Sequence, residues 1–436
     1  MAFDVIIGRN ESDKKAYGKN GLAYIGKSFV TMGNYTSISN PIYMDVARTH
    51  VVLICGKRGS GKSYTMGAMA ESLSDLGVEE SGNIASVIFD TMGIYWTMKY
   101  KNTKDEALLM EWGLDAKNVP TRVFVPFGHY QEFKDKGIEV DSPFAIKLSD
   151  LDASDWVGLF DLPFTNPIAI VIESVISTLT EKGDPFGFKE INALIKRTEN
   201  VSQDNKNAAM ALFDAAKTWK VFDEEIGTTV KDMISAGQTT IIDLSMYAAL
   251  GAFNVRALII GLVSKKIFNE RMASRKNEEI QAVQHGADYA RYKVKRDMPL
   301  VWIFIDEAHE FLPVTGKTPA TDALVQLLRE GRQPGISLVV ATQQPGKIHT
   351  DAITQADIVM SHKITAKLDV DALNAVTQSY MSSSITDKIN GLPKLKGAAI
   401  ILDDSSERIY PMRVRPRFTW HGGEAPTAIR KVDVEV

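Results

Sequence analysis

Residues Gly56 to Ser63 read GKRGSGKS, which matches the pattern G-x-x-x-x-G-K-[ST]. The loop follows the apolar run HVVLIC, residues 50–55, and precedes apolar residues at helical spacing: Met66, Met69, Ala70, Leu73 and Leu76. A strand, a glycine-rich turn and a helix in this order predict a phosphate-binding loop. The glycines let successive backbone N–H groups turn inward, and the helix N-terminus adds partial positive charge.

Two side chains of this loop have predicted roles in holding a nucleoside triphosphate. We expect Lys62 to reach the β- and γ-phosphate oxygens and Ser63 to bind Mg²⁺. The predicted ligands of the loop are therefore a nucleoside triphosphate and Mg²⁺, and the family resemblance given below implies that the nucleotide is ATP. The predicted nucleotide-binding residues are those of the loop and the residue after it: Gly56, Lys57, Arg58, Gly59, Ser60, Gly61, Lys62, Ser63 and Tyr64.

Composition limits the classes of protein to which the chain can belong. Its 436 residues are 44% hydrophobic, which is enough to bury a large core. The formal net charge is −4, so any binding of nucleic acid must use a local positive surface, such as the wall of a channel. The single cysteine, Cys55, excludes an intrachain disulfide. Its place in a strand favours a buried apolar role over that of a reactive thiol.

No segment has the length or composition of a membrane span or a signal peptide. The most apolar windows, residues 167–179 and 257–263, are short, and the first contains Glu173. A single cysteine is also typical of a reducing compartment. We therefore expect a soluble, cytoplasmic protein that makes no contact with a membrane.

Five regions follow one another along the chain. Strand and helix signals alternate on both sides of a helical stretch, and this alternation predicts an α/β fold with a parallel sheet. The expected strands are residues 50–55, 84–89, 121–126, 239–244, 300–305, 337–341, 358–363 and 398–402. The expected regions are a small β-rich cap (1–49), the first part of the core (50–150), a helical insertion (151–237), the second part of the core (238–415) and a C-terminal tail (416–436).

A second chemical motif is the run LVWIFIDE, residues 300–307. Continuous apolar residues suit a central parallel strand, and the carboxyl end of such a strand lies beside the phosphate-binding loop. Asp306 is then expected to hold Mg²⁺ through water, and Glu307 to orient and deprotonate the attacking water. A strand that simply ends in an acidic turn is the alternative. The neighbouring pair His309 and Glu310 departs from H-E-x-x-H, which argues against a separate metal site.

A third motif is REGRQPG, residues 329–335, followed by a strand and then by TQQP, residues 342–345. An arginine near a subunit boundary can stabilise charge on a neighbour's γ-phosphate, so Arg329 and Arg332 are candidate catalytic residues. The side-chain amide of Gln343 or Gln344, at the end of the next strand, can sense the γ-phosphate. Solvated charges at a helix end are the alternative interpretation of the two arginines.

Together, GKRGSGKS, LVWIFIDEAHEFLP and LLREGRQPGISLVVATQQP resemble the HerA-type ATPases, which are relatives of the FtsK translocases. The stretch IFDTMGIYW, residues 88–96, resembles a further segment of this family. The resemblance implies a RecA-like core, a homohexameric ring with ATP at subunit interfaces, double-stranded DNA in the pore and a partner nuclease of the NurA type. It assigns phosphate and Mg²⁺ to Lys62 and Ser63, the Walker B pair to Asp306 and Glu307, the trans-acting arginine finger to Arg332 and the sensor to Gln343 or Gln344.

The two ends of the chain depart from the family pattern or extend it. Only residues 1–49 precede the strand that leads into the loop, so we expect the family's N-terminal β-barrel to be reduced, which affects the nuclease partnership more than the motor. In the tail, Arg413, Arg415 and Arg417 precede Trp420. They resemble family tails that brace the neighbouring subunit near its nucleotide. An exposed terminal strand with alternating arginines is the alternative.

Three basic stretches are candidates for contact with a DNA backbone. Solvated loops are the alternative for each stretch, and nothing in them encodes base recognition. The stretches are residues 289–296 (YARYKVKR), the lysines Lys99, Lys101 and Lys104, and Lys347 with His349.

These patterns predict a ring-forming, Mg²⁺-dependent ATPase of HerA type that translocates or unwinds double-stranded DNA, with a role in DNA end processing or repair. Two other classes stay open. One is a secretion or conjugation motor of the VirB4 or TraG kind. The other is a nucleotide-gated scaffold that hydrolyses ATP slowly and serves a partner effector. Duplex DNA should stimulate a motor that grips phosphates, with binding that weakens as salt rises, whereas a scaffold should not respond to DNA.

Overall fold

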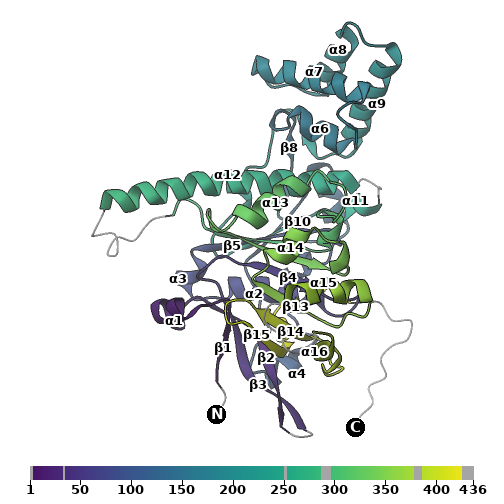
Figure 1. The fold of residues 1–436 in the computed structure, drawn as a ribbon. Coiled ribbons are helices and arrows are strands. Elements are labelled where there is room, and N and C mark those ends of the chain that lie inside the picture. The colour runs from purple at the N-terminus through teal and green to yellow at the C-terminus, as the bar shows by residue number, and fades with distance from the viewer. Residues whose placement is uncertain (1–2, 33–34, 250–252, 286–295, 378–384, 425–436) are drawn as a thin grey trace.

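One mixed sheet organises the chain (Figure 1). The computed structural model describes residues 3–32, 35–249, 253–285, 296–377 and 385–424. In these ranges, 13 strands form the sheet in the order β1 (Val5–Ile7), β3 (Tyr35–Asp45), β2 (Leu22–Met32), β15 (Arg408–Val414), β14 (Ala398–Asp403), β13 (Ile358–Ser361), β4 (Val51–Cys55), β12 (Ile336–Thr342), β11 (Leu300–Ile305), β5 (Ile84–Asp90), β10 (Thr239–Asp243), β6 (Thr121–Pro126) and β7 (Ser142–Phe144).

The centre of the sheet is parallel, as the alternation of strand and helix signals predicts. β4 pairs in parallel with β13 and β12, and β11 pairs in parallel with β12 and β5. Only β12 therefore separates the strand that leads into the phosphate-binding loop from the strand that carries the acidic motif. Because the carboxyl ends of parallel strands lie at one edge of a sheet, the two motifs meet there.

Helices cover the two faces of this parallel core because side chains alternate along each strand. Val52 and Ile54 of β4 face the cluster that includes α2 (Lys62–Ser74), whereas Leu53 and Cys55 face the opposite cluster. That opposite cluster includes the two helices α12 (Phe253–His285) and α13 (Thr321–Glu330). Cys55 is thus a buried apolar residue, as expected.

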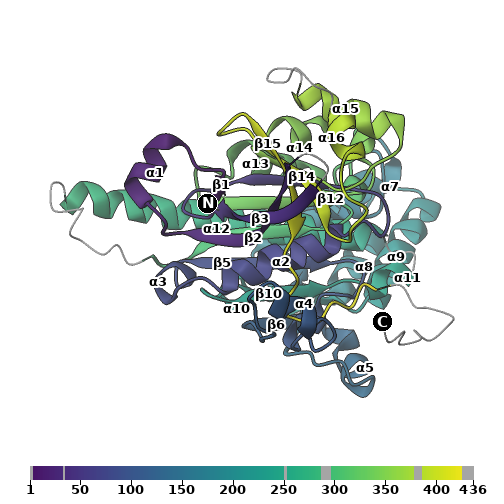
Figure 2. The same ribbon diagram turned by 90° about the horizontal axis from the view of Figure 1, so that it is seen from below.

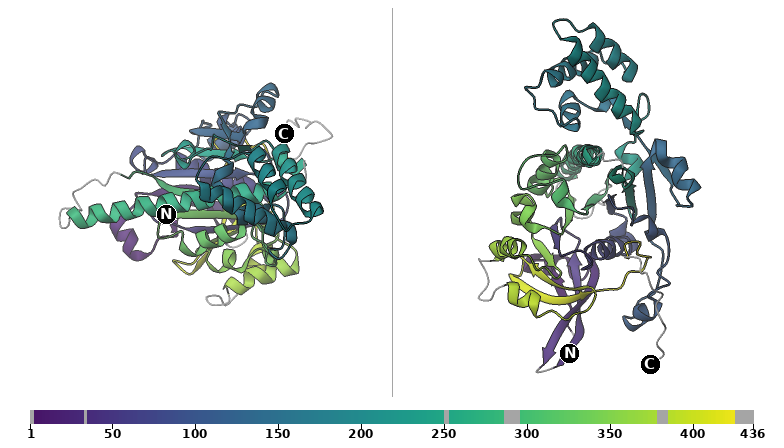
Figure 3. Two further views of the ribbon diagram at one scale, coloured as in Figure 1. Left: turned by 90° about the horizontal axis from the view of Figure 1, so that it is seen from above. Right: turned by 90° about the vertical axis from the view of Figure 1, so that its right-hand side faces the viewer.

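Residues 151–237 form the helices α6 (Ala153–Leu159), α7 (Pro167–Lys182), α8 (Phe188–Arg197), α9 (Gln203–Thr218) and α10 (Val230–Met233). The short strands β8 (Ile146–Lys147) and β9 (Phe222–Asp223) pair in parallel beside them. The buried ring of Trp156 contacts Phe160, Phe213 and Phe222, which gives the helices an aromatic core. Figure 3 shows α6 to α9 standing off from the main sheet. α10 lies against the sheet, where Thr240 of β10 donates a hydrogen bond to the Met233 carbonyl.

The expected N-terminal cap continues the sheet instead of standing apart from it. β2 pairs with β3 on one side and with β15 on the other, all antiparallel (Figure 2). Arg9 and Asp45 form a buried ion pair within this region. His50, at the start of the core, lies 3.2 Å from Asp45 and 2.6 Å from Asp357, and so links the region to the core. The N-terminal strands therefore belong to the same sheet as the core. The division into five regions stays a prediction.

The sequence pattern located the central strands to within two residues, but it missed β15 and the full length of α12. The remaining helices are short: α1 (Glu11–Tyr17), α3 (Val78–Ser81), α4 (Glu106–Glu111), α5 (Tyr130–Asp135), α11 (Met246–Ala249), α14 (Thr350–Thr354), α15 (Lys367–Thr377) and α16 (Ile385–Asn390). In the described part of the chain, no helix combines the length and the apolar character needed to cross a bilayer.

Candidate active site

The predicted phosphate-binding loop connects β4 to α2 at the carboxyl edge of the parallel strands. Gly59 and Gly61 have φ angles of 73° and 111°, which residues with a Cβ rarely adopt. A Cβ added to Gly56 would lie 2.3 Å from Ser60 Oγ, so that position has no room for a side chain. The loop needs these glycines to turn directly into the N-terminus of α2, where an anion is stabilised.

Lys62 and Ser63, the first two residues of α2, face the acidic residues that follow β11. Ser63 Oγ donates a hydrogen bond to Asp306 Oδ2 at 2.5 Å. Lys62, which is only 5% exposed, places Nζ 3.8 Å from Glu307 Oε1. Residues from the first two sequence motifs, which lie more than 200 positions apart, therefore form one cluster.

Glu307 has the surroundings of a proton acceptor. Its φ of 50° lies in the left-handed region that residues other than glycine rarely adopt. The side-chain amide of Gln343 donates a hydrogen bond to Glu307 Oε1, while Glu307 Oε2 is buried and has no hydrogen-bond partner among the described residues. Burial raises the pKa of Glu307, although the Gln343 hydrogen bond and the Lys62 charge oppose the rise. A carboxylate of raised pKa with a spare oxygen suits a base that accepts a proton from water.

Gln343 and Gln344 are the two predicted sensors of the γ-phosphate. The side chain of Gln343 lies against Glu307. Gln344 donates its backbone N–H to Thr342 Oγ1 at 3.0 Å. The same hydroxyl lies 3.1 Å from His309 Nδ1, which is 3.6 Å from Glu307 Oε2. Burial lowers the pKa of His309. The imidazole is therefore a neutral neighbour of Glu307 near pH 7.

The arginine motif occupies the end of α13 and the turn after it. Arg329 Nε donates to Asp351 Oδ2 of α14 at 2.6 Å. Arg332 is exposed and forms no ion pair with any described residue. Arg271, a buried residue of α12, donates to the Pro334 carbonyl at 2.8 Å and so fixes the turn that carries Arg332. Within the described residues, neither Arg329 nor Arg332 bonds to the phosphate-binding loop of its own chain.

Tyr64 is engaged by the C-terminal segment. Its hydroxyl accepts the backbone N–H of Arg417 at 2.7 Å, and its ring packs edge-on against His421. Arg415 and Arg417 are fully buried and pair with Glu71 of α2 at 3.1 and 2.7 Å. The alternative of an exposed arginine strand is therefore wrong for these two residues. Binding of nucleotide by Tyr64 and bracing of a neighbour by the tail stay predictions, and residues 425–436 lie outside the described residues.

Sequence reasoning gave no role to two residues that touch the site, Tyr95 and His362. Tyr95 Oη lies 3.3 Å from Asp306 Oδ2. His362 Nε2 lies 2.9 Å from Thr65 Oγ1 of α2, and its Nδ1 lies 3.0 Å from the Ala398 carbonyl. Burial lowers the pKa of His362 to about 4, so this link is uncharged near pH 7. Both residues follow the carboxyl ends of central strands. A polar residue in that position is the sequence feature that could have predicted their place in the site.

The three basic stretches differ in how their charges are used. Residues 289–295 lie outside the described residues, and Arg296 Nη1 donates to Asn83 Oδ1 at 3.1 Å. Lys99 pairs with Asp141 at 2.7 Å, and Lys104 pairs with Glu424. These acidic partners neutralise much of the second stretch within the chain. Lys347 is exposed and follows β12 at the edge that carries Glu307.

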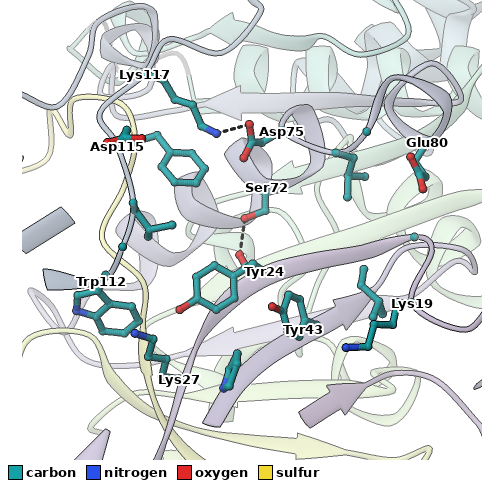
Figure 4. Close-up of a pocket in the computed structure, with 18 residues that line it drawn as sticks. Lys19, Tyr24, Lys27, Tyr43, Ser72, Asp75, Glu80, Trp112, Asp115 and Lys117 are labelled. Atoms are coloured by element: carbon teal, nitrogen blue, oxygen red, sulfur yellow. Dashed lines mark hydrogen bonds and ion pairs between the residues drawn. The ribbon is translucent and has the colours of Figure 1, made fainter. Parts of the chain in front are cut away.

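A hollow of about 700 Å³ lies at the end of α2 that is remote from the phosphate-binding loop (Figure 4). Tyr24, Tyr43 and Trp112 form part of its wall. Lys117 pairs with Asp75 at 2.5 Å on the opposite side. No residue predicted to bind nucleotide or to act in catalysis lines this hollow, so it is not part of the candidate active site.

Three features define a P-loop NTPase: a parallel α/β sheet, a glycine-rich loop that opens a helix, and an acidic pair on a strand that one intervening strand separates from the loop's strand. The chain belongs to the family described as the central domain of helicase HerA, whose model matches residues 29–266. This match confirms the resemblance of the sequence motifs to the HerA-type ATPases. The matched range holds the phosphate-binding loop but ends before β11, so the roles of the acidic pair and the arginine turn rest on geometry.

Two curated relatives align with the chain. It is 25% identical over 209 residues to the DNA double-strand break repair helicase HerA of Pyrococcus furiosus. This alignment covers 44% of the present chain and 37% of the relative. It is 25% identical over 210 residues to the probable DNA double-strand break repair helicase HerA of Methanocaldococcus jannaschii, covering 44% and 40%. The chain thus spans about two fifths of the length of these relatives.

The solved structure of VirB4 from Thermoanaerobacter pseudethanolicus is similar in fold. It has a TM-score of 0.53 and covers 91% of this chain and 96% of that chain, at 11% sequence identity. At this low identity the likeness concerns the fold alone. It agrees with the expected P-loop core, sheet and helical additions.

Proposed function

We propose that the chain is an ATPase whose hydrolysis site comprises the loop Gly56–Ser63, Asp306, Glu307 and Gln343. One observation carries this proposal: Ser63 bonds to Asp306 while Lys62 and Gln343 both approach Glu307. A triphosphate bound at the N-terminus of α2 would therefore meet a cation, a base and an amide sensor together. Family membership and the curated relatives named as helicases support this activity.

The residues present fit a magnesium ion. The Ser63 hydroxyl and the Asp306 carboxylate supply hard oxygen atoms 2.5 Å apart beside the phosphate-binding loop, and Mg²⁺ prefers such ligands in combination with phosphate oxygens. We propose that Ser63 binds the ion directly and that Asp306 holds it through water. When bound, the ion would neutralise charge on the phosphate oxygens.

The remaining roles follow from the contacts of each side chain. Lys62 holds phosphate oxygens by charge, because its ammonium group is buried next to the loop. Glu307 keeps Oε1 on Gln343 and presents Oε2 to the attacking water, from which it accepts a proton. Gln343 follows β12 and is hydrogen-bonded to Glu307. Loss of the γ-phosphate would therefore alter the positions of both side chains.

We further propose a homohexameric ring in which Arg332 of one subunit acts on the nucleotide of its neighbour. Its exposure, its lack of an ion pair within the described residues and the fixed turn that carries it support this role. A guanidinium group delivered in this way stabilises charge that develops in the transition state. Arg329, which is already paired with Asp351, is the weaker candidate.

Double-stranded DNA is the proposed substrate of translocation, because the two curated relatives are named for double-strand break repair. The net charge of −4 requires that the contact surface be local. Lys347, which is exposed at the edge of the sheet that carries Glu307, is proposed to contribute to it. We also propose that the protein acts in DNA end processing or repair, that it has a partner nuclease of the NurA type and that it is cytoplasmic.

The test is the rate of ATP hydrolysis with and without duplex DNA across a series of salt concentrations. DNA should stimulate hydrolysis, and the stimulation should weaken steeply as salt rises because phosphate contacts release counterions. A rate that is indifferent to DNA at every salt concentration would contradict the translocase and favour a scaffold.

Glu307→Gln is the control for the chemistry. It should bind ATP like the wild type and lose roughly 10²–10⁴-fold in hydrolysis rate, the usual contribution of a general base. Appreciable residual hydrolysis would remove Glu307 as the base.

A further inference from the structure

The loop after β5 brings a buried tyrosine to the candidate active site. Asp90, the last residue of β5, accepts backbone N–H groups from Met92 at 3.1 Å, Gly93 at 2.7 Å and Tyr95 at 2.7 Å. Gly93 has a φ of 69°, and a Cβ there would lie 2.8 Å from Ser245 Oγ. The loop is therefore tightly wound around one carboxylate, which fixes the backbone of Tyr95.

The Tyr95 hydroxyl lies between the two motifs that form the site. Its side chain is 1% exposed, and Oη is 3.3 Å from Asp306 Oδ2 and 3.3 Å from the Ser63 carbonyl oxygen. A phenolic O–H can donate one hydrogen bond, and a carboxylate or carbonyl oxygen accepts it.

Asp306 has three hydrogen-bond donors around it. Ser63 Oγ and Tyr95 Oη both approach Oδ2, and the backbone N–H of Glu307 donates to Oδ1 at 2.9 Å. The Ser63 donor belongs to the helix that binds phosphate, and the Glu307 donor belongs to the same strand end as Asp306 itself. Tyr95 is the donor among these that comes from a third element. Its single O–H faces both Asp306 Oδ2 and the Ser63 carbonyl oxygen, each 3.3 Å away, so it contacts both residues of the site.

We propose that Tyr95 is a positioning residue for the magnesium site, holding the Asp306 carboxylate in register with Ser63. This inference rests on the proposed function, because it presumes that Ser63 and Asp306 hold the ion. Partners that orient the ligands of a metal typically contribute about 10–100-fold to its affinity. Loss of the Tyr95 hydroxyl therefore weakens the hold on Mg²⁺ without removing any group that touches the nucleotide.

The experiment measures binding of a fluorescent, non-hydrolysable ATP analogue to the full chain while Mg²⁺ is titrated. Tyr95→Phe removes one oxygen and keeps the ring that packs in the core. It should raise the Mg²⁺ concentration at half-maximal binding roughly tenfold. Binding of the analogue in excess EDTA and the melting temperature should stay close to those of the wild type.

Tyr247→Phe is the matched control. Tyr247 is also buried, and its hydroxyl donates to the Trp219 carbonyl at 2.8 Å. This variant loses a buried hydrogen bond of the same kind, but it should leave the Mg²⁺ midpoint unchanged. An equal shift in both variants would show that Tyr95 acts only through general stability, which would overturn the proposal.

The variant Asp306→Asn distinguishes a failure of the Tyr95 proposal from a failure of the proposed magnesium site. In Asp306→Asn, the Mg²⁺ dependence should be weakened already, and adding Tyr95→Phe should change it little further because the carboxylate is gone. If Asp306→Asn shifts the midpoint and Tyr95→Phe does not, Tyr95 is no positioning residue, although the magnesium site stands. If the wild type binds the analogue without any dependence on Mg²⁺, the proposed magnesium site fails and this inference fails with it.

Discussion

The sequence suggests for two groups of arginines that they contact a neighbouring subunit near its nucleotide. In the structure, one group is exposed and the other is buried. Arg332 follows α13 at the carboxyl edge of the sheet and is exposed. Arg415 and Arg417 follow β15 and are fully buried on Glu71 of α2. A buried charge is costly unless it is paired, and Glu71 pairs with both of these arginines within the chain. The buried pair therefore stabilises the fold, and the exposed arginine is the one that we propose to act on a neighbouring subunit.

The largest effect is expected for Arg332→Ala. The hydrolysis rate should fall roughly 10³–10⁵-fold, as for other arginine fingers, while nucleotide affinity and the free energy of unfolding stay near the wild-type values because the side chain is exposed. Steady-state hydrolysis, equilibrium binding of a nucleotide analogue and urea unfolding check these three quantities. Gln333→Ala, at the next exposed position, is the control. Equal losses of rate in both variants would assign the effect to the turn instead of to the guanidinium group.

Arg417→Ala should affect stability. The free energy of unfolding should fall by about 3–5 kcal/mol, because Glu71 would lose one of its two buried cationic partners. Urea unfolding measures the loss. Arg408→Ala removes an exposed arginine of β15 and should change stability by no more than about 0.5 kcal/mol. If both variants unfolded at the same urea concentration, the buried cluster would not be what holds the C-terminal segment.

A second buried cluster adds a dependence on pH. Burial alone would lower the pKa of His50, but hydrogen bonds to Asp357 and Asp45 outweigh it and raise the pKa to about 9. Since the pKa is raised on folding from 6.5, the charged imidazole contributes its full stability below about pH 6.5, and that contribution is lost as pH rises through about 9.

The variant His50→Gln tests this dependence. The free energy of unfolding of the wild type should exceed that of the variant by about 3 kcal/mol near pH 6, at about 1.4 kcal/mol per pKa unit. The difference should shrink towards pH 10. Urea unfolding at a series of pH values provides the measurement, and a difference that stays constant with pH would mean that His50 is not charged in the folded protein.

The smallest effect is expected for Arg329→Ala. Its ion pair with Asp351 leaves the arginine side chain 60% exposed, so the free energy of unfolding should fall by less than about 1 kcal/mol. The hydrolysis rate should fall far less than in Arg332→Ala. The same hydrolysis and unfolding assays compare the two variants directly. A loss of rate as large as that of Arg332→Ala would transfer the finger to Arg329.

The sequence predicted the parts of the molecule in which local pattern and burial agree. The run Leu300–Ile305 is apolar throughout because β11 is buried on both faces, and GKRGSGKS has the glycines that its turn requires. β15 was missed because Arg408, Pro411 and Arg413 interrupt the apolar residues of a strand that is only partly buried.

The contacts of the site residues were harder to predict than their identity. Asp306, Glu307, Lys62 and Ser63 follow from motifs, but the approach of Tyr95 to Asp306 depends on how β5 and β11 pair. The burial of Arg417 depends on a contact with Glu71 across 346 positions of the chain. No local pattern records such a contact, so the difference between the two groups of arginines emerges only from the fold.

The most direct measurement mixes two inactive variants. Glu307→Gln lacks the base but keeps Arg332, whereas Arg332→Ala lacks the finger but keeps Glu307. If one subunit completes the catalytic pocket of the next, the mixture should regain hydrolysis that neither variant shows alone, because some interfaces then combine an intact Glu307 with an intact Arg332. A mixture as inactive as its two components would contradict the sharing of one pocket between subunits.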